Sequence, residues 1–362
     1  ARVGRLLEVG AERVEPPCPH YTADECGGCQ LQHLAYPAQL AAKASFVGDA
    51  LRRLARLDVA DPAVVPASEP LEYRTKITLA IGARGRRIGL HRYDRPGEVF
   101  DLRWCHITHP DLNRLWQALS PLRRDLPANV THLVLRLDRS GGRHLIVKTS
   151  AAGRPWTGGE NVRRGLERAG VQAVIWWHPE GGAPRAVSGA GEAFPATVFE
   201  QVNPVMGELA RSAAIAALGP VQGLHVWDLY AGVGDTTDRL AAAGATVESV
   251  ESDRRAVAWA ETHGPGRPAV ARHAGRVEDL VRELKPAALV ITNPPRTGMD
   301  ERATDGLARS AARRIAYVSC DPGTLARDIT RLGAAWRLAS VRSFDLFPQT
   351  AHIETVALLE RA

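Results

Sequence analysis

The sequence lacks the features that mark membrane, secreted and repeat proteins. It has no run of about 18 apolar residues that could cross a membrane, and its first residues do not form a secretory signal. Five cysteines in a chain without such a signal argue against a disulfide framework. No internal repeat or low-complexity tract occurs. These absences predict a cytoplasmic globular protein, and 362 residues are enough for two or three domains.

Lysine is scarce, because it occurs only at positions 43, 76, 148 and 285, and arginine supplies nearly all of the positive charge. The formal net charge is +6 and the pI is about 9.3, which favours an anionic partner such as nucleic acid. Arginine suits this role because it contacts phosphates with two donors and stacks on bases. A GC-rich genome would also enrich Ala, Gly and Arg, so the charge by itself favours RNA or DNA binding only weakly.

From about residue 200 the apolar pattern alternates between the helix period and the strand period. Such alternation is typical of a doubly wound parallel sheet. The expected helices are residues 209–218, 237–243, 255–261 and 304–312. The expected strands are residues 225–230, 246–251, 287–292 and 315–319, followed by a terminal pair at 339–347 and 353–359.

The part before residue 200 has a different character. Residues 1–17 are expected to hold a strand and an exit loop, and residues 18–36 are rich in Cys, Gly and His with little periodicity. Residues 37–57 have the apolar spacing of a helix. A helix pattern at 160–169 and a series of strand patterns predict a mixed α/β middle domain. The strand patterns are residues 75–81, 87–91, 133–137, 144–148 and 172–177.

The loop after the strand at 225–230 has the composition of a nucleoside-binding loop. Gly232 and Gly234 let the backbone approach a ligand, and Glu251, about 20 residues past the loop's start, can accept hydrogen bonds from ribose. The Gly-x-Gly-x-x-Gly of dinucleotide sites and a phosphate-loop lysine are absent, and Asp228 and Asp235 would repel a pyrophosphate. A cationic nucleoside such as S-adenosylmethionine is favoured, and with it a methyltransferase over an NAD enzyme. A plain turn in a structural domain is the alternative.

Two further loops follow predicted strands. In Asn293-Pro-Pro-Arg296 the prolines fix φ, so this loop can hold a polar side chain against a flat base. Ser319-Cys320 ends the next strand, and Asp321-Pro322-Gly323 turns the chain. Ligands of open α/β sheets bind at the carboxyl ends of the strands, and Cys320 has no evident structural partner. We therefore interpret Cys320 as a nucleophile rather than as a small apolar core residue.

The other four cysteines have the pattern of metal ligands. They are Cys18, Cys26, Cys29 and Cys105. Three lie in a Cys-x7-Cys-x2-Cys arrangement, within a segment so poor in apolar periodicity that a metal would have to organise it. This spacing allows an iron–sulfur cluster or zinc about equally. The Cys-x3-Cys-x2-Cys of radical enzymes is absent, so radical chemistry is not expected. The nearby His20 and His33 are expected to be solvent or loop residues.

The order of these motifs resembles the RNA uracil-5-methyltransferase family, which makes 5-methyluridine in tRNA and ribosomal RNA. The matching segments run nearly end to end. They are Phe199-Glu-Gln-Val-Asn203, Asp228–Gly234, Asn293–Arg296, Ser319–Pro322, Phe347–Glu354 and the four cysteines, which resemble the 4Fe–4S ligands of many members. The resemblance implies an α/β fold with a C-terminal Rossmann-like class I methyltransferase domain, an N-terminal iron–sulfur segment and a mixed α/β middle domain.

The resemblance also implies roles for the site residues. The Cys320 thiolate would add to uracil C6 so that C5 can attack the methyl group, and Glu354 would then remove the C5 proton. Phe199 would stack on the extracted base and Gln201 would read its edge. The implied substrate-binding residues are Phe199, Gln201, Asn293 and Arg296. The implied cofactor-binding residues are Gln201, Asp228, Tyr230, Gly232, Gly234, Glu251 and Asn293.

One departure from the family pattern bears on this chemistry. The family usually has Asp at position 293, and Asn293 can accept a hydrogen bond from uracil N3–H only without ionic assistance. Two alternatives therefore stay open. One is amino methylation of a base, because Asn-Pro-Pro is also the loop of exocyclic-amine methyltransferases, although Arg296 stands where those have an aromatic residue. The other is a non-catalytic RNA-binding or assembly factor.

The sequence thus predicts a monomeric, S-adenosylmethionine-dependent RNA (uracil-5-)-methyltransferase without a membrane partner, with rRNA favoured over tRNA as substrate. Its cluster is expected to be structural, and the resemblance favours iron–sulfur over zinc. The predicted domains are the tail of a truncated β-barrel at 1–14, the Cys-rich segment with a helix at 15–69, the middle domain at 70–195 and the catalytic domain at 196–362. A further piece is expected to precede residue 1.

Overall fold

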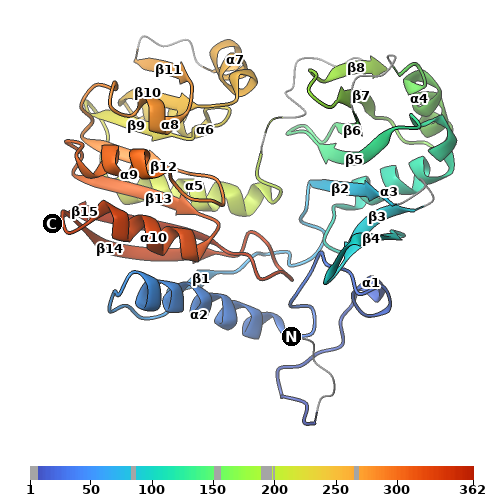
Figure 1. The fold of residues 1–362 in the computed structure, drawn as a ribbon, viewed down its shortest axis with the longest axis horizontal. Coiled ribbons are helices and arrows are strands. Elements are labelled where there is room, and N and C mark those ends of the chain that lie inside the picture. The colour runs from blue at the N-terminus through green and yellow to red at the C-terminus, as the bar shows by residue number, and fades with distance from the viewer. Residues whose placement is uncertain (1–6, 83–86, 151–155, 189–197, 199, 265–268) are drawn as a thin grey trace. The chain divides into compact units, whose positions relative to one another are not determined.

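The computed structural model describes residues 7–82, 87–150, 156–188, 198, 200–264 and 269–362 (Figure 1). The chain divides into two compact units. The first unit comprises residues 1–39, 68–197 and 348–351, and the second comprises residues 40–67, 198–347 and 352–362. Within the described part of the chain, no helix has both the length and the apolar content needed to span a bilayer.

The first unit is built on a sheet of seven described strands in the order β4-β3-β2-β5-β6-β7-β8 (Figure 1). They are β2 Lys76–Ile81, β3 Ile88–Arg92, β4 Arg95–Asp101, β5 Val130–Leu137, β6 Arg143–Thr149, β7 Val174–Pro179 and β8 Arg185–Ser188. Neighbouring strands are antiparallel except β6 and β7, which run parallel and are connected through helix α4 (Gly159–Arg168). The mixed α/β character expected for this region is confirmed.

Helix α3 (Pro110–Leu119) supplies much of the core of the first unit and was not among the expected elements. Its buried side chains have the helical spacing of one apolar face. They are Leu112, Leu115, Trp116 and Leu119. Pro110 at the first helical position and the Asp111 N–H bonded to the His109 ring start the helix. A 3-10 turn, η2 (Ser120–Asp125), extends it, and a short helix, α1 (Pro19–Ala23), lies upstream.

The second unit is built on a sheet of eight described strands in the order β1-β14-β15-β13-β12-β9-β10-β11 (Figure 1). They are β1 Val64–Val65, β9 His225–Leu229, β10 Thr246–Glu251, β11 Val270–Ala274, β12 Leu289–Thr292, β13 Arg314–Ser319, β14 Trp336–Phe344 and β15 Glu354–Arg361. The strands from β9 to β13 run parallel, and β15 is inserted antiparallel between β13 and β14. The expected parallel sheet with a terminal strand pair is therefore confirmed.

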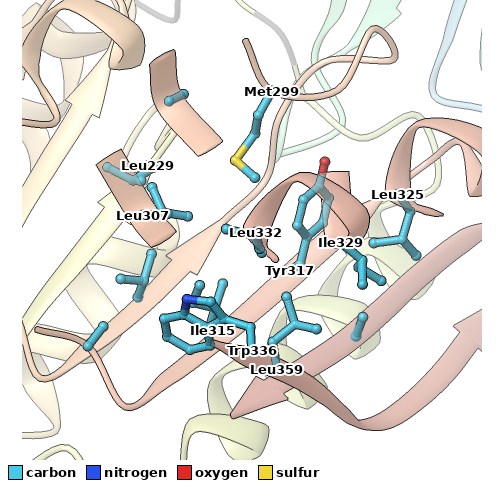
Figure 2. Close-up of a cluster of buried hydrophobic side chains, with 14 of the residues drawn as sticks. Leu229, Met299, Leu307, Ile315, Tyr317, Leu325, Ile329, Leu332, Trp336 and Leu359 are labelled. Atoms are coloured by element: carbon cyan, nitrogen blue, oxygen red, sulfur yellow. The ribbon is translucent and has the colours of Figure 1, made fainter. Parts of the chain in front are cut away.

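Helices cover both faces of this sheet, as expected for a doubly wound fold. They are α2 Tyr36–Leu54, α5 Pro204–Leu218, α6 Asp235–Ala242, α7 Arg254–His263, α8 Val277–Leu280, α9 Glu301–Ala308 and α10 Pro322–Leu332. On one face, Ile315 and Tyr317 of β13 pack against Leu307 of α9 and against Leu325 and Ile329 of α10 (Figure 2). The opposite face is covered by apolar residues of α5 and α6.

Helix α5 begins earlier than the apolar pattern suggests, and helix α10 was not expected. The chain does not continue as a loop after Asp321, because the Asp321 side chain accepts the Thr324 N–H (2.8 Å) and Pro322 opens α10. In the same way Asn203 caps α5, which begins at Pro204 rather than at residue 209. An Asx residue before proline satisfies a free helix N–H while proline sets the helical φ. Each of these helices therefore starts directly after a motif of the expected site.

Helix α2 belongs with the second unit except for its first turn. Val47 and Leu51 are fully buried in the core that β13 and α10 also line. This grouping differs from the sequence boundary at residues 15–69, because apolar burial joins segments that are far apart in the chain. Lys43 of the same helix is fully buried, and its ammonium donates to Asp345 Oδ1 (2.6 Å) and to the Phe347 carbonyl (3.0 Å).

Replacing Lys43 by methionine is expected to destabilise the second unit by about 3–5 kcal/mol, because a buried carboxylate loses its cationic partner. Urea unfolding measures the change. Arg53→Met on the same helix is the control, since the Arg53 side chain is 78% exposed in its pair with Asp49 and exposed pairs contribute about 0–1 kcal/mol. Equal destabilisation by both substitutions would contradict the importance of the buried pair.

Candidate active site

The catalytic and cofactor residues predicted from the sequence lie in the second unit where the structure describes them, and most of them lie at the ends of neighbouring strands. The cofactor loop follows β9, Glu251 ends β10, Asn293 follows β12 and Cys320 follows β13. These four strands are parallel, so the four segments lie at one edge of the sheet. Because β15 runs in the opposite direction, its first residue, Glu354, lies at that same edge.

The loop from Tyr230 to Gly234 has an unusual backbone. Tyr230, Gly232 and Gly234 all have positive φ, at +62°, +58° and +90°. A side chain at Gly234 would crowd Ala260, 3.3 Å from the new Cβ, whereas a Cβ at Gly232 would meet no atom within 4 Å. Gly232 therefore exposes bare backbone to open space, which is what close approach of a ligand requires.

Two carboxylates brace this loop. The buried Asp228 accepts the Thr237 hydroxyl (2.6 Å), which ties β9 to the first turn of α6, and burial raises the pKa of Asp228 to about 7. Glu251 accepts the N–H of Gly232 (2.9 Å) and that of Asp253 (2.7 Å). The ribose-binding role expected for Glu251 is compatible with its partial exposure. Asp228 thus fixes the two ends of the loop through its bond to Thr237, and the composition of the loop alone does not reveal this role.

The strand register sets Cys320 beside Glu354. Ser319 pairs with Thr355 in the antiparallel ladder of β13 and β15, so the following residue, Cys320, is level with the preceding one, Glu354. Cys320 is a free, partly exposed thiol, whereas Glu354 is 1% exposed. Among the described residues, Glu354 Oε2 has no hydrogen-bond partner. A buried carboxylate oxygen without a partner is costly to folding and is a common feature of reactive sites.

The electrostatics of the pair are set by burial and by Arg296. Burial raises the pKa of Glu354 to about 7, and the Arg296 charge opposes that rise. Burial also raises the pKa of the Cys320 thiol; Glu354 adds to this rise and Arg296 lowers it. Arg296 therefore favours the ionised form of both groups. Asn293 and Arg296 are exposed, while the Asn293 N–H donates to the Leu229 carbonyl (3.1 Å) at the end of β9.

The Phe-x-Gln-x-Asn segment leads into α5. Phe199 lies outside the described residues, so its expected stacking role stays a prediction. Gln201 packs so closely on α5 that a Cβ at Gly207 would lie 2.9 Å from the Gln201 Cβ. Asn203 accepts the Met206 N–H (3.2 Å) and donates to the Leu346 carbonyl (3.3 Å). Asn203 therefore joins α5 to the segment before Glu354. Its position before Pro204 indicates the helix cap, but the bond to Leu346 is known only from the structure.

Comparison with known proteins agrees with this arrangement. Residues 269–362 match the family described as tRNA (Uracil-5-)-methyltransferase. The chain is 33% identical to an uncharacterized RNA methyltransferase of Thermosynechococcus vestitus, over 98% of this chain and 87% of the relative. It is 31% identical to the 23S rRNA (uracil(1939)-C(5))-methyltransferase RlmD of Aromatoleum aromaticum, over 100% of this chain and 89% of the relative. The chain belongs to the RNA uracil-5-methyltransferase family.

The fold of the family extends over nearly the whole chain. The crystal structure of Pyrococcus abyssi tRNA (uracil-54, C5)-methyltransferase in complex with S-adenosyl-L-homocysteine superimposes with a TM-score of 0.74, at 23% identity. The match covers 98% of this chain and 87% of the other. This likeness confirms the α/β methyltransferase fold, including the part outside the catalytic sheet.

The four remaining cysteines of this family member all lie in the first unit, and all are free. The pKa is raised to about 11 for Cys26 and to about 12 for Cys29, mainly by burial and in smaller part by the charge of Cys105. Cys18 is also affected by Cys105, so the four thiols are near enough to repel one another when ionised. Within the described part of the chain, however, no three His, Cys, Asp or Glu side chains form a ready metal-binding group.

Polar side chains that sequence analysis did not single out support this cysteine region. Buried Asn113 of α3 donates to the Cys105 carbonyl (3.0 Å) and accepts the Cys105 N–H (2.9 Å). The Cys18 N–H donates to Gln32 (3.3 Å). The expectation that His20 is a solvent or loop residue is wrong, because it is 4% exposed in α1 and bonds to Asp24 and to the Arg103 N–H.

The pKa of Glu354 predicts a pH-dependent stability. The folded protein holds this proton up to about pH 7, whereas the ordinary pKa of a glutamate side chain is 4.5. The native state therefore binds more protons between these limits, and its stability falls as pH rises. Glu354→Gln is expected to remove this loss of stability. The loss would be about 3 kcal/mol, because each pKa unit of difference between the folded and unfolded states corresponds to about 1.36 kcal/mol. Urea unfolding on both sides of this pH range measures it. The exposed Glu261→Gln is the control, and parallel pH curves for wild type and Glu354→Gln would contradict the prediction.

Proposed function

We propose that this protein transfers a methyl group from S-adenosylmethionine to C5 of a uridine in RNA, through a transient bond between Cys320 Sγ and uracil C6. One observation carries the proposal. The β13–β15 register sets a free thiol level with a buried carboxylate, at the edge of the sheet where the cofactor loop also ends. Nucleophilic addition and proton removal need these two groups at adjacent atoms of one ring.

Each step can be assigned to residues of the chain. Cys320 loses its proton to solvent, helped by the Arg296 charge, and its sulfur adds to C6, which moves the electron pair of the C5–C6 bond into an enolate. S-adenosylmethionine would supply the electrophilic methyl group that C5 attacks; its sulfur–methyl bond would break and S-adenosylhomocysteine would leave. The Glu354 carboxylate then takes the C5 proton. The C5–C6 double bond re-forms as the C6–sulfur bond breaks, and the Cys320 thiolate is released.

The loop after β9 suits a cationic nucleoside. Gly232 presents bare backbone next to open space, and Glu251, held by two backbone N–H groups, keeps a partly exposed carboxylate nearby. Such a carboxylate can accept hydrogen bonds from ribose hydroxyls. Gly232, Gly234 and Glu251 are therefore the residues that would hold S-adenosylmethionine, with Tyr230 and Asn293 beside them.

The uracil would be read by the exposed Asn293–Arg296 loop together with the segment that carries Gln201. Asn293 can accept from N3–H through its amide oxygen, as a neutral substitute for the family's usual Asp. Gln201 and Phe199 are proposed to contact the base, and Arg296 to brace the loop. An rRNA substrate is favoured, because the relative from Aromatoleum aromaticum, aligned over the whole chain, is named for uracil 1939 of 23S rRNA.

The four upstream cysteines are proposed to hold a 4Fe–4S cluster, with zinc as the alternative. Their donor set suits either, since both are bound by four thiolates. The charges of Cys18, Cys26 and Cys105 all contribute to the raised pKa of Cys29, which supports a common site, because thiols that lie close together favour binding of a cation that deprotonates them. The cluster would be structural and would organise the segment from Cys18 to Cys29.

Cys320 and Glu354 substitutions should stop the reaction at different points. Cys320→Ala is expected to lower methyl transfer by about 10³-fold or more and to form no adduct. Glu354→Gln is expected to accumulate an RNA–protein adduct, because the C5 proton cannot leave after methylation. Denaturing gels with unmodified RNA detect the adduct of Glu354→Gln, because wild type releases its product from this RNA. Gels with RNA containing 5-fluorouridine show whether Cys320→Ala has lost the adduct, and nucleoside mass spectrometry measures methyl transfer. Methylation of RNA by Cys320→Ala at the wild-type rate would refute the covalent mechanism, and a methylated exocyclic amine in place of 5-methyluridine would support the amino-methyltransferase alternative.

The metal assignment predicts about four iron atoms per chain in anaerobically purified protein. Elemental analysis and visible absorption test this, because zinc is colourless and would give about one atom per chain. Cys29→Ser should reduce the metal content, whereas Cys320→Ser should leave it unchanged. Metal-free wild-type protein with native thermal stability would rule out either metal as a structural element.

A further inference from the structure

The loop that carries Asn293 and Arg296 is fixed at its far end by the helix that follows Cys320. At its near end, the Asn293 N–H donates to the Leu229 carbonyl. At its far end, the Met299 N–H donates to Asp328 Oδ2 (2.7 Å). Asp328 is a residue of α10, the helix that begins two residues after the proposed nucleophile.

Asp328 is fully buried and receives several hydrogen bonds. Besides the Met299 N–H, Oδ2 accepts the Tyr317 hydroxyl (2.7 Å), and Oδ1 accepts Nε (2.9 Å) and Nη2 (2.7 Å) of Arg327. Figure 2 shows the Tyr317 ring within the apolar cluster and its hydroxyl pointing out of that cluster. The carboxylate therefore connects β13, α10 and the loop after β12 at a single group.

Two arginines of α10 reinforce this connection from the more exposed side. Arg327 Nη2 donates to the carbonyls of Thr297 (2.8 Å) and Met299 (3.2 Å), and Arg331 Nη1 donates to that of Met299 (3.3 Å). Consecutive backbone groups of the loop are thus bonded to one face of α10. The contact involves the backbone of the loop, so it fixes the path of the chain rather than a single side chain.

Gly298 allows this close approach. It has a φ of +72°, and a Cβ there would lie 2.6 Å from Asp328 Oδ2 and would also clash with Arg327. Any larger residue would push the loop away from α10. The Asn293–Arg296 loop is therefore held at both ends, by β9 before Pro294 and by α10 after Gly298.

We propose that Asp328 is a positioning residue that fixes the Asn293–Arg296 loop relative to Cys320. This inference rests on the proposed function, because it assigns the loop to the base and Cys320 to the attack on it. Burying a carboxylate gains little net free energy even when its hydrogen bonds are complete. A buried carboxylate such as Asp328 instead fixes the geometry of the groups bonded to it. This matters for the rate, because displacing a reacting group by about 1 Å can slow a reaction about 100-fold.

Asp328→Asn tests the proposal, because an amide keeps the shape of the side chain but turns one acceptor into a donor that faces N–H groups. The kcat of methyl transfer is expected to fall about 10- to 100-fold, with a smaller effect on the KM for S-adenosylmethionine, because Asp328 is bonded to the loop that follows Asn293 and not to the loop around Gly232. Amide hydrogen exchange at Gly298 and Met299 is expected to accelerate, and exchange at Gly232 is not. Asp279→Asn, which removes an exposed carboxylate of α8, is the control and should match wild type.

A second variant covers the case in which Asp328→Asn fails to fold. The Arg327 side chain is 39% exposed, so Arg327→Gln should fold while losing the bonds to Thr297 and Met299. It is expected to lower kcat and accelerate exchange at Met299 in the same direction as Asp328→Asn. Unchanged exchange at Met299 in the folded variants, or unchanged kcat despite faster exchange, would overturn the positioning role.

The two proposals can fail separately. If wild-type protein forms neither 5-methyluridine nor the 5-fluorouridine adduct, the proposed function fails and the positioning role fails with it, whatever the exchange data. If wild type is active and Asp328→Asn lowers thermal stability without lowering kcat at a temperature where it is folded, only the positioning role fails. A lower kcat, with a smaller change in the KM for the cofactor and with faster exchange confined to residues 297–299, supports both.

Discussion

The pairing register of β13 with β15 is the constraint on which the site depends. The two strands are antiparallel neighbours in an otherwise largely parallel sheet, and Ser319 is level with Thr355. This single register sets Cys320 beside Glu354, although 33 residues separate them in the chain. Because side chains alternate between the faces of a sheet, a slip of one residue would turn one of the two groups to the opposite face. The geometry of the site is therefore as well specified as the apolar core that fixes the register.

The surroundings of this pair carry several polar groups at buried positions. Glu354 has an oxygen without a described partner, Asp328 connects three segments, and Lys43 reaches Asp345 inside the second unit. Each of these groups would be costly to bury alone. Asp328 and Lys43 hold neighbouring loops in place through backbone groups, at Met299 and at Phe347. Burying these groups makes the folded state less stable, but it fixes the arrangement that a reaction on a flat base requires.

Much of the fold follows from the sequence because periodicity reports burial directly. The strand expected at 246–251 agrees with β10 at both ends, and the terminal strand pair is present. The missed elements have identifiable causes. Helix α10 follows an Asp-Pro-Gly segment that reads as a turn, although Asp321 is its cap and Pro322 its first residue. Helix α3 lies among strand patterns, and its apolar spacing is distinct only over ten residues.

The sequence by itself determined the order of motifs, the strands that present them and the candidates for the reactive side chains, because these depend on local periodicity and residue chemistry. Only the tertiary structure decided the partners. It showed that Asp228 bonds to Thr237 and braces the loop from within, that His20 is buried, and that Asp328 holds the loop after β12. Hydrogen bonds between distant segments leave no periodic trace in a chain, since any two polar residues can pair once the core has brought their backbones together.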